Sequence, residues 1–226
     1  GQLRSIQVNI VGEVVSPGTF TLPVTTTLFN ALYVSGGPGS IGSFRNIKII
    51  RDNKIFATVD IYEFLIDADP RGNIPLKDED IIFVPPVEKR VKVSGEFKRE
   101  GLFEMKEGEK LDKLILFAAG FTNESYLMKL QIKRKGQFGY QLIDVPIQEA
   151  NTTDLKDGDV ILNKRILDIY ENRVTIYGAV FRPGDYEWEE GLNLKELILK
   201  ADSITADAYL NRGIITRYND DLSTSN

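Results

Sequence analysis

Apolar residues alternate with polar ones in three stretches of this chain, and the three stretches follow the same pattern. The alternation begins at Val8, Val91 and Val174, each followed by an apolar residue two positions later. Successive side chains of a strand point to opposite faces of the sheet, so this alternation predicts a half-buried strand. A second pair of large apolar residues follows each time and predicts the other strand of a hairpin. The second pairs are Phe20 and Leu22, Phe103 and Met105, and Tyr186 and Trp188.

After each hairpin the apolar spacing changes from two residues to three and four. This spacing places the apolar side chains on one face of a helix. The helical positions are Leu28, Ala31 and Leu32, then Leu111, Leu114 and Ile115, then Leu194, Leu197 and Ile198. Asn193 and Glu196 have the spacing of a capping box at the start of the third helix. Gly36-Gly37 and Gly120 end the first two helices as C-cap residues.

The three stretches are copies of one unit, because identical residues recur at a constant offset of 83 (95 − 12 and 178 − 95). Between the two strands of each hairpin stand two glycines, six positions apart, which we predict to be structural turn residues. These glycines are Gly12 and Gly18, Gly95 and Gly101, and Gly178 and Gly184. The other positions identical in all three copies are Val8, Leu28, Ile49 and Arg51 and their counterparts. A fixed register over this length indicates tandem duplication.

The first two copies also share a closing pattern, an acidic turn that leads into a last apolar strand. The turn holds Asp78 and Asp80 in the first copy and Asp157 and Asp159 in the second, an offset of 79 (157 − 78). The shorter offset indicates that the second copy has lost four residues (83 − 79) in its middle. The third copy ends at Asn226 before such a strand, so we expect it to lack the closing strand and the native chain to continue.

The order of elements, a hairpin, a helix and further strands, predicts an α+β fold in which one main helix packs on a mixed sheet. We expect three tandem β-grasp-like modules spanning residues 1–86, 87–169 and 170–226, the third truncated. Pro85-Pro86 marks the first boundary. A unit of about 80 residues buries a modest share of its surface, so we expect packing between neighbouring modules to stabilise the array.

The composition removes most of the side chains on which catalysis depends. The 226 residues include no cysteine and no histidine. This excludes a disulfide, a thiolate nucleophile and a Cys/His metal site, and it removes the best proton-transfer group near neutral pH. Calcium takes about six to eight oxygen ligands, more than the two carboxylates of each closing turn supply. We therefore expect no catalytic residue, no metal site, no cofactor and no enzyme activity.

Charge and hydropathy limit the classes of partner and the membrane segments that this sequence can have. The formal net charge is −5, which speaks against nucleic acid as a partner. No apolar run approaches the ~18 residues that a membrane-spanning helix needs. The N-terminal sequence GQLRSIQVNI lacks the basic start, apolar centre and cleavage site of a signal peptide.

The repeated unit resembles the SLBB module, the soluble-ligand-binding β-grasp domain. The resemblance is carried in the first copy by Val8, Ile10, Gly12, Glu13, Pro17, Gly18, Phe20, Leu28, Ala31, Leu32, Gly36, Gly37, Leu76, Asp78 and Asp80. Tandem SLBB modules are similar to those of bacterial polysaccharide-export proteins of the outer membrane, whose N-terminal export domain is not found in these residues.

The resemblance implies a non-catalytic scaffold that takes part in capsule or exopolysaccharide export, in the periplasm or outer membrane of a Gram-negative bacterium. It also implies transient contact with the polysaccharide and with other envelope export components. In the full-length parent it implies self-association into a ring-like homo-oligomer.

Two sets of recurring side chains are candidates for glycan or partner contact. Arg51, Arg134 and Arg217 recur at one strand position and could donate forked hydrogen bonds to the carboxylates of an acidic polymer. A solvated strand face or an ion pair between modules would explain them without a ligand, and we favour that explanation. Tyr126 and Tyr209 match each other and follow the helix in a loop region, where binding residues often lie.

Two other classes of function compete with the scaffold. A soluble small-ligand or glycan-binding receptor would hold its ligand in a discrete pocket between helix and sheet, and that ligand would raise the melting temperature. A glycosidase would need two carboxyl groups about 5–10 Å apart across a cleft, and nothing in the sequence points to such a pair.

Overall fold

The structure, a computed structural model, describes residues 4–218 and 224–225. The chain divides between Ile166 and Leu167 into two compact units. The first unit holds two five-stranded sheets, and the second holds the third copy. The three module boundaries inferred above remain predictions. No helix in the described part of the chain is both long enough and apolar enough to span a membrane.

The first sheet and its helices follow the predicted order of elements. The strands are β1 (Ser5–Gly12), β2 (Gly18–Pro23), β3 (Ile47–Arg51), β4 (Lys54–Val59) and β5 (Ile81–Val84). The helices are α1 (Leu28–Val34), α2 (Ile61–Asp67) and the short 3-10 helix η1 (Pro70–Gly72).

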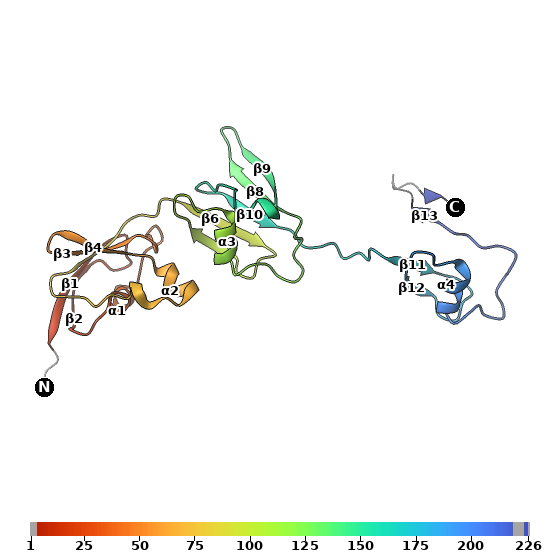
Figure 1. The fold of residues 1–226 in the computed structure, drawn as a ribbon, viewed down its shortest axis with the longest axis horizontal. Coiled ribbons are helices and arrows are strands. Elements are labelled where there is room, and N and C mark those ends of the chain that lie inside the picture. Colours follow the sequence, from red (N-terminus) through yellow and green to blue (C-terminus); the bar gives the residue numbers. More distant parts are fainter. Residues whose placement is uncertain (1–3, 219–223, 226) are drawn as a thin grey trace. The chain divides into compact units, whose positions relative to one another are not determined.

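These strands form one mixed sheet in the order β2-β1-β5-β3-β4 (Figure 1). β1 and β5 run parallel, whereas the other neighbours are antiparallel. Helix α1 covers one face of the sheet, because its apolar stripe of Leu28, Ala31 and Leu32 is buried against the strands. The two glycines flank the connection between the first two strands, since β1 ends at Gly12 and β2 begins at Gly18.

The second sheet repeats this arrangement. The strands are β6 (Arg90–Gly95), β7 (Gly101–Glu104), β8 (Lys129–Lys135), β9 (Tyr140–Pro146) and β10 (Val160–Asn163). They lie in the equivalent order β7-β6-β10-β8-β9, again with one parallel pair, β6 and β10. The helices are α3 (Leu111–Phe117) and the 3-10 helix η2 (Ile147–Glu149).

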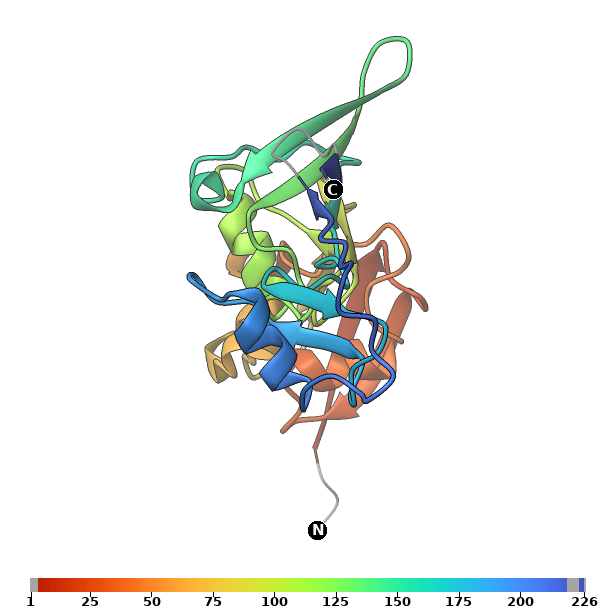
Figure 2. The same ribbon diagram turned by 90° about the vertical axis from the view of Figure 1, so that its right-hand side faces the viewer.

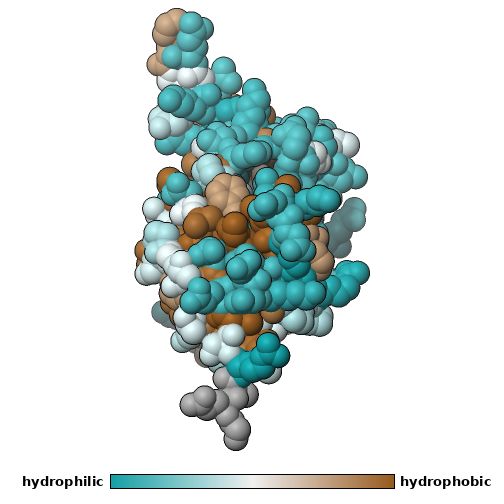
Figure 3. Space-filling view, turned by 90° about the vertical axis from the view of Figure 1, so that its left-hand side faces the viewer, coloured by the Kyte–Doolittle hydropathy of each residue, from teal (hydrophilic) through white to brown (hydrophobic). Residues whose placement is uncertain are grey.

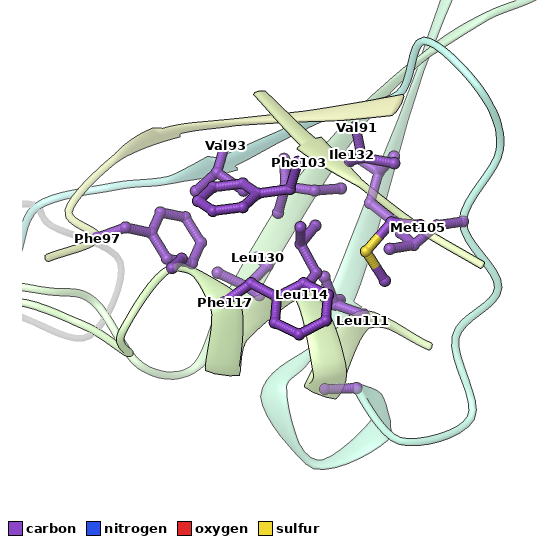
Figure 4. Close-up of a cluster of buried hydrophobic side chains, with 14 of the residues drawn as sticks. Val91, Val93, Phe97, Phe103, Met105, Leu111, Leu114, Phe117, Leu130 and Ile132 are labelled. Atoms are coloured by element: carbon purple, nitrogen blue, oxygen red, sulfur yellow. The ribbon is translucent and has the colours of Figure 1, made fainter. Parts of the chain in front are cut away.

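The core of this second module lies between α3 and its sheet. Figure 4 shows the side chains of Leu111, Leu114 and Phe117 from α3 directed toward those of Val91 and Ile132 from the strands. All five are at most 2% exposed. The tandem α+β modules expected from the alternation are therefore present, each with its own buried cluster.

The net loss of four residues in the second copy is the sum of two opposite changes. Ile47 pairs with Val59 in the first module, and Leu130 pairs with Val145 in the second. The offset therefore rises from 83 to 86 (145 − 59) across the hairpin, which is three residues longer in the second module. It then falls to 79, so the segment that forms α2 in the first module is seven residues shorter.

Helix α2 is an element that the repeat did not predict. It begins after Asp60, whose side chain accepts a hydrogen bond from the backbone N–H of Tyr62 as an N-cap. The second module has only η2 at this place, so the two modules differ in the element that follows the second hairpin.

The third copy forms a smaller assembly of β11 (Arg173–Ile176), β12 (Gly184–Glu187) and α4 (Leu194–Lys200). The capping box predicted for Asn193 and Glu196 is present at the start of α4. Strands β13 (Arg217–Tyr218) and β14 (Thr224–Ser225) pair only with each other among the described residues. Leu194 is 51% exposed, whereas Leu28 and Leu111 at the same position are fully buried. In the described part of this copy no strand corresponds to β5 or β10, which explains the exposed helix.

Candidate assembly and binding sites

Arg45 is the centre of the contact between the first two modules. It precedes β3 and is only 4% exposed. Its Nε donates to Oδ2 of Asp60 in its own module at 3.0 Å. Its two terminal nitrogens donate to the carboxylate of Glu109 in the second module at 2.6 and 2.8 Å. One of them also donates to the backbone oxygen of Glu104 at 3.1 Å, so the guanidinium bridges the two modules with nearly all its donors.

Further polar contacts surround this bridge. Ser43 Oγ donates to Oε1 of Glu104 at 2.5 Å, and the backbone N–H of Phe44 donates to Oε2 at 2.7 Å. Lys106 Nζ lies 2.8 Å from Oδ2 of Asp60. Each module thus supplies both cations and carboxylates; Arg45, Lys106, Asp60 and Glu109 are ion-paired, and the carboxylate of Glu104 is held by neutral donors.

An aromatic contact completes the joint, as we call the set Ser43, Arg45, Asp60, Tyr62, Glu104, Lys106, Glu109 and Phe117. The ring of Tyr62 from α2 meets the ring of Phe117 from α3 edge to face, with centroids 5.1 Å apart. The Arg45 guanidinium carbon lies 5.0 and 4.8 Å from the two ring centroids. The hydroxyl of Tyr62 accepts a hydrogen bond from the backbone N–H of Glu104 at 3.1 Å.

The charges of the joint are fixed by their neighbours. Burial opposes the charge of Arg45, but hydrogen bonds to Glu109 and Asp60 outweigh this and raise the pKa of Arg45. Burial alone would raise the pKa of Glu109, but hydrogen bonds from Arg45 and the backbone of Lys106 leave it below the ordinary value. Burial raises the pKa of the Tyr62 hydroxyl. These groups therefore hold one protonation state around neutral pH.

The arrangement suits mechanical connection. An intact buried ion pair adds little net stability, whereas removing one partner costs roughly 3–5 kcal/mol because a buried charge is left unpaired. The joint consequently favours one relative placement of the two modules over alternatives. Its polar groups are engaged with each other.

The recurring arginines bind carboxylates of their own modules. Arg51 Nε and a terminal nitrogen donate to the two oxygens of Asp80 at 2.8 and 2.7 Å. Arg134 makes the same forked contact with Asp159 at 2.9 and 2.7 Å. Both aspartates are fully buried, or nearly so, at 0% and 1% exposure. These pairs connect β3 or β8 to the closing turn, so they lie within modules and not between them. Arg217 lies in β13.

The carboxylates of the acidic closing turns accept hydrogen bonds from backbone N–H groups, both of the first strand of the module and of the turn itself. Asp78 accepts from the backbone N–H of Gln7 at 2.7 Å, and Asp157 accepts from that of Arg90 at 2.8 Å. Asp80 also accepts from the backbone N–H of Lys77, three residues earlier. Among the described residues no group of three acidic side chains is placed to hold a metal ion.

The candidate tyrosines occupy loops of different surroundings. Tyr126 is 38% exposed, and its backbone N–H donates to the oxygen of Lys164 at 2.8 Å. Tyr209 is 73% exposed and follows α4. Their role in glycan or partner contact stays a prediction.

One groove on the first module is lined by apolar side chains. It lies between α1 and α2 and includes Phe29, Tyr33, Phe64 and Leu65. Tyr33 is 88% exposed and Leu65 is 61% exposed. Figure 3 shows apolar side chains gathered in the middle of a largely polar face.

The repeat pattern does not predict the joint. Arg45 and Phe117 correspond to Met128 and Val34 in the other copy (45 + 83 and 117 − 83), so a search for identical positions passes over them. The available signal was local: Asp60 precedes the apolar spacing Ile61, Phe64 and Leu65 of a helix.

Two linked β-grasp-like sheets, each closed by a parallel strand and an arginine–aspartate pair, define a tandem-module α+β protein. The family model described as "SLBB domain" matches residues 7–59, 90–146 and 173–220, and the chain belongs to this family. It is similar to two Escherichia coli proteins, both named polysialic acid transport protein KpsD. Each is 25% identical over 166 residues, which cover 71% of this chain and 28% of the relative. The chain therefore matches less than a third of the length of these relatives.

Proposed function

We propose that this chain is a non-catalytic scaffold segment of a protein that exports a polysaccharide through the envelope of a Gram-negative bacterium. The observation that carries the proposal is the joint, in which two SLBB modules are connected through a buried Arg45 bound to carboxylates of both. A rigid connection between repeated modules is what a scaffold requires. The relatives named as polysialic acid transport proteins support the export role.

The proposal places the parent protein in the periplasm or at the outer membrane, assembled as a ring-like homo-oligomer with other envelope export components. Polysaccharide contact is transient, because an export path must release the polymer that it binds. Arg51 and Arg134 contribute by stabilising their modules, because their guanidinium groups are already paired with Asp80 and Asp159.

The experiment deletes the gene in the source bacterium and restores it as wild type, Arg45→Ala or Arg71→Ala. Arg71 is a matched control, since its ion pair with Asp69 involves a side chain that is 86% exposed. We expect deletion to remove polysaccharide from the cell surface, with wild type and Arg71→Ala restoring it. Arg45→Ala should restore less at equal protein level by immunoblot. Normal surface polysaccharide in the deletion strain would contradict the proposal.

Assembly is tested on the full-length parent extracted from membranes. Native mass spectrometry should show a closed multimer. A strictly monomeric parent would refute the ring-like assembly.

The apolar groove between α1 and α2 favours a second candidate function, a receptor for a small apolar or glycan ligand. A thermal-shift screen of the 226-residue chain separates the two functions, because a ligand bound well above its Kd raises the melting temperature. The variant Tyr33→Ala should abolish such a shift if the groove holds the ligand. If the chain is a scaffold, we expect no change of melting temperature with cobalamin-like compounds or small sugars.

A further inference from the structure

The hairpin of β8 and β9 extends beyond the sheet to which it belongs. β8 pairs with β10 only from Gln131 to Lys133, whereas its pairing with β9 continues to Lys135 and Tyr140. Figures 1 and 2 show this two-stranded ribbon projecting from the second module. Beyond Lys133 the backbone of β8 therefore pairs with β9 alone.

One face of the ribbon carries lysines opposite apolar side chains. The register places Lys133 opposite Leu142 and Lys135 opposite Tyr140, and these four side chains share the face turned away from the core cluster. Tyr140 is 69% exposed and Leu142 is 65% exposed. Lys133 Nζ lies 4.1 Å from the centroid of the Tyr140 ring. We call Lys133, Lys135, Tyr140 and Leu142 the ribbon face.

The lysines of the ribbon face have no acidic partner among the described residues. The neighbouring cations differ, since Arg134 on the other face binds Asp159 and Lys129 at the base binds Asp144. The net charge of the whole chain is −5. A local pair of unneutralised cations on an otherwise acidic chain points to an anionic partner.

The first module does not repeat this feature. Its β3–β4 hairpin closes at once through Asp52 and Asn53, both at positive φ, directly after Arg51 pairs with Lys54. The three extra residues of the second hairpin therefore lengthen a ribbon that the module fold does not need.

We propose that the ribbon face binds a carboxylated segment of an acidic polysaccharide. A pyranose ring has an apolar C–H face that packs on an aromatic ring, which Tyr140 offers beside Leu142. Sugar carboxylates then lie within reach of the ammonium groups of Lys133 and Lys135, which form charge-assisted hydrogen bonds. The inference rests on the proposed export function and specifies the chemical class of the polymer.

The distribution of apolar groups favours a glycan over a lipid surface. At the tip of the hairpin Phe138 is 95% exposed, and its neighbours there are Gly136, Gln137 and Gly139. Tyr140 and Leu142 lie along the flat side of the ribbon. A membrane-inserting tip would concentrate several apolar side chains at its end, whereas a polymer chain lies along a flat face.

The test measures binding of the 226-residue chain to polysialic acid and to polygalacturonate, with neutral dextran and anionic phosphatidylglycerol vesicles in parallel. Lys133→Ala/Lys135→Ala and Tyr140→Ala should each weaken binding to the acidic glycans by about tenfold or more. Lys48→Ala/Lys54→Ala and Phe56→Ala are the matched controls in the hairpin of the first module, and we expect less than a twofold change. Raised salt should weaken glycan binding by screening.

Several results would overturn the inference. The inference is wrong if the matched controls lose as much binding as the ribbon variants, or if both ribbon variants keep their affinity for glycan. It is also wrong if the chain binds the vesicles but not the acidic glycans. Far-UV circular dichroism verifies that each variant retains the fold, as expected for exposed side chains. The inference and the export proposal fail separately. If deletion abolishes export but the ribbon variants bind glycan normally, only the inference is wrong. If deletion leaves export intact while the ribbon face binds acidic glycan, only the export proposal is wrong.

Discussion

At the scale of single residues, two glycines show why the module needs a residue without a side chain. Gly12 and Gly95 have φ of +91° and +94°, a region that other residues rarely adopt. A Cβ on Gly12 would lie 2.2 Å from the backbone oxygen of Val84, and one on Gly95 would lie 2.0 Å from that of Asn163. The glycines therefore allow the first strand of the hairpin to approach the closing strand.

The third copy supplies a control for this interpretation. Gly178 has φ of +101°, yet a Cβ there would meet no heavy atom within 4 Å. We expect Gly178→Ala to cost about 1 kcal/mol, from backbone strain alone. Gly95→Ala should cost roughly 3 kcal/mol or more, because the collision with β10 adds to the same strain. Urea unfolding measures both, and equal costs would show that close approach to β10 is unimportant.

The lowered pKa of Glu109 makes the joint sensitive to acid. A carboxyl group whose pKa is lower in the folded state contributes stability above its unfolded pKa and loses it as pH falls through the folded value. The ordinary pKa of a glutamate side chain is 4.5. We therefore expect the urea midpoint of the first unit to be constant near neutral pH and to decrease once the pH is below about 4.5.

Glu109→Gln tests this pH dependence. The variant should have a lower urea midpoint at pH 7 and a smaller decrease in acid than the wild type. Glu107→Gln is the control, because the Glu107 side chain is 95% exposed. An acid profile unchanged by Glu109→Gln would mean that other carboxyl groups control the decrease.

At the scale of elements, α2 is what turns two modules into one unit. Its Tyr62 and Ile66 pack against the core cluster of the second module, while its Phe64 packs on Phe29 of α1 with ring centroids 4.9 Å apart. One helix of seven residues thus contacts two modules. The corresponding η2 of the second module is a single short turn.

A double-mutant cycle measures this contact. Tyr62→Ala, Phe117→Ala and the double variant should give a coupling free energy of about 0.5–1.5 kcal/mol, the usual value for an edge-to-face aromatic pair. Tyr62→Phe keeps the ring and should cost about 1 kcal/mol through the lost acceptor for the N–H of Glu104. Additive effects of the two alanine substitutions, seen in urea midpoints, would indicate that the rings are energetically independent.

At the scale of the whole molecule, the division between Ile166 and Leu167 predicts two unfolding transitions. Trp188 is the single tryptophan and lies in the second unit. Its fluorescence should therefore change at a lower urea concentration than the far-UV circular dichroism of the first unit, because Leu194 and Trp188 itself are each 51% exposed. Arg45→Ala should lower the urea midpoint of the first unit, which unfolds at the higher concentration, and leave the midpoint of the second unit unchanged. A single coincident transition for both probes would contradict two separately folding units.

The sequence alone determined the repeated module. Alternating apolar residues predicted the hairpins, the three-and-four spacing predicted α1, α3 and α4, and Asn193 with Glu196 predicted a capping box that is present. These are local signals, since strand and helix periods are set by neighbouring residues of one segment. Positions identical in the copies specify what the copies share.

Only the tertiary structure decided what joins the copies. Arg45 and Glu109 are 64 residues apart and meet because two modules pack together, and α2 occurs in the first module but not in the second. The partners of Arg51 and Arg134 were likewise decided by the closing turn, 29 and 25 residues further along the chain. No repeat period records such contacts, because an interface between two copies places different faces together and so selects different residues in each.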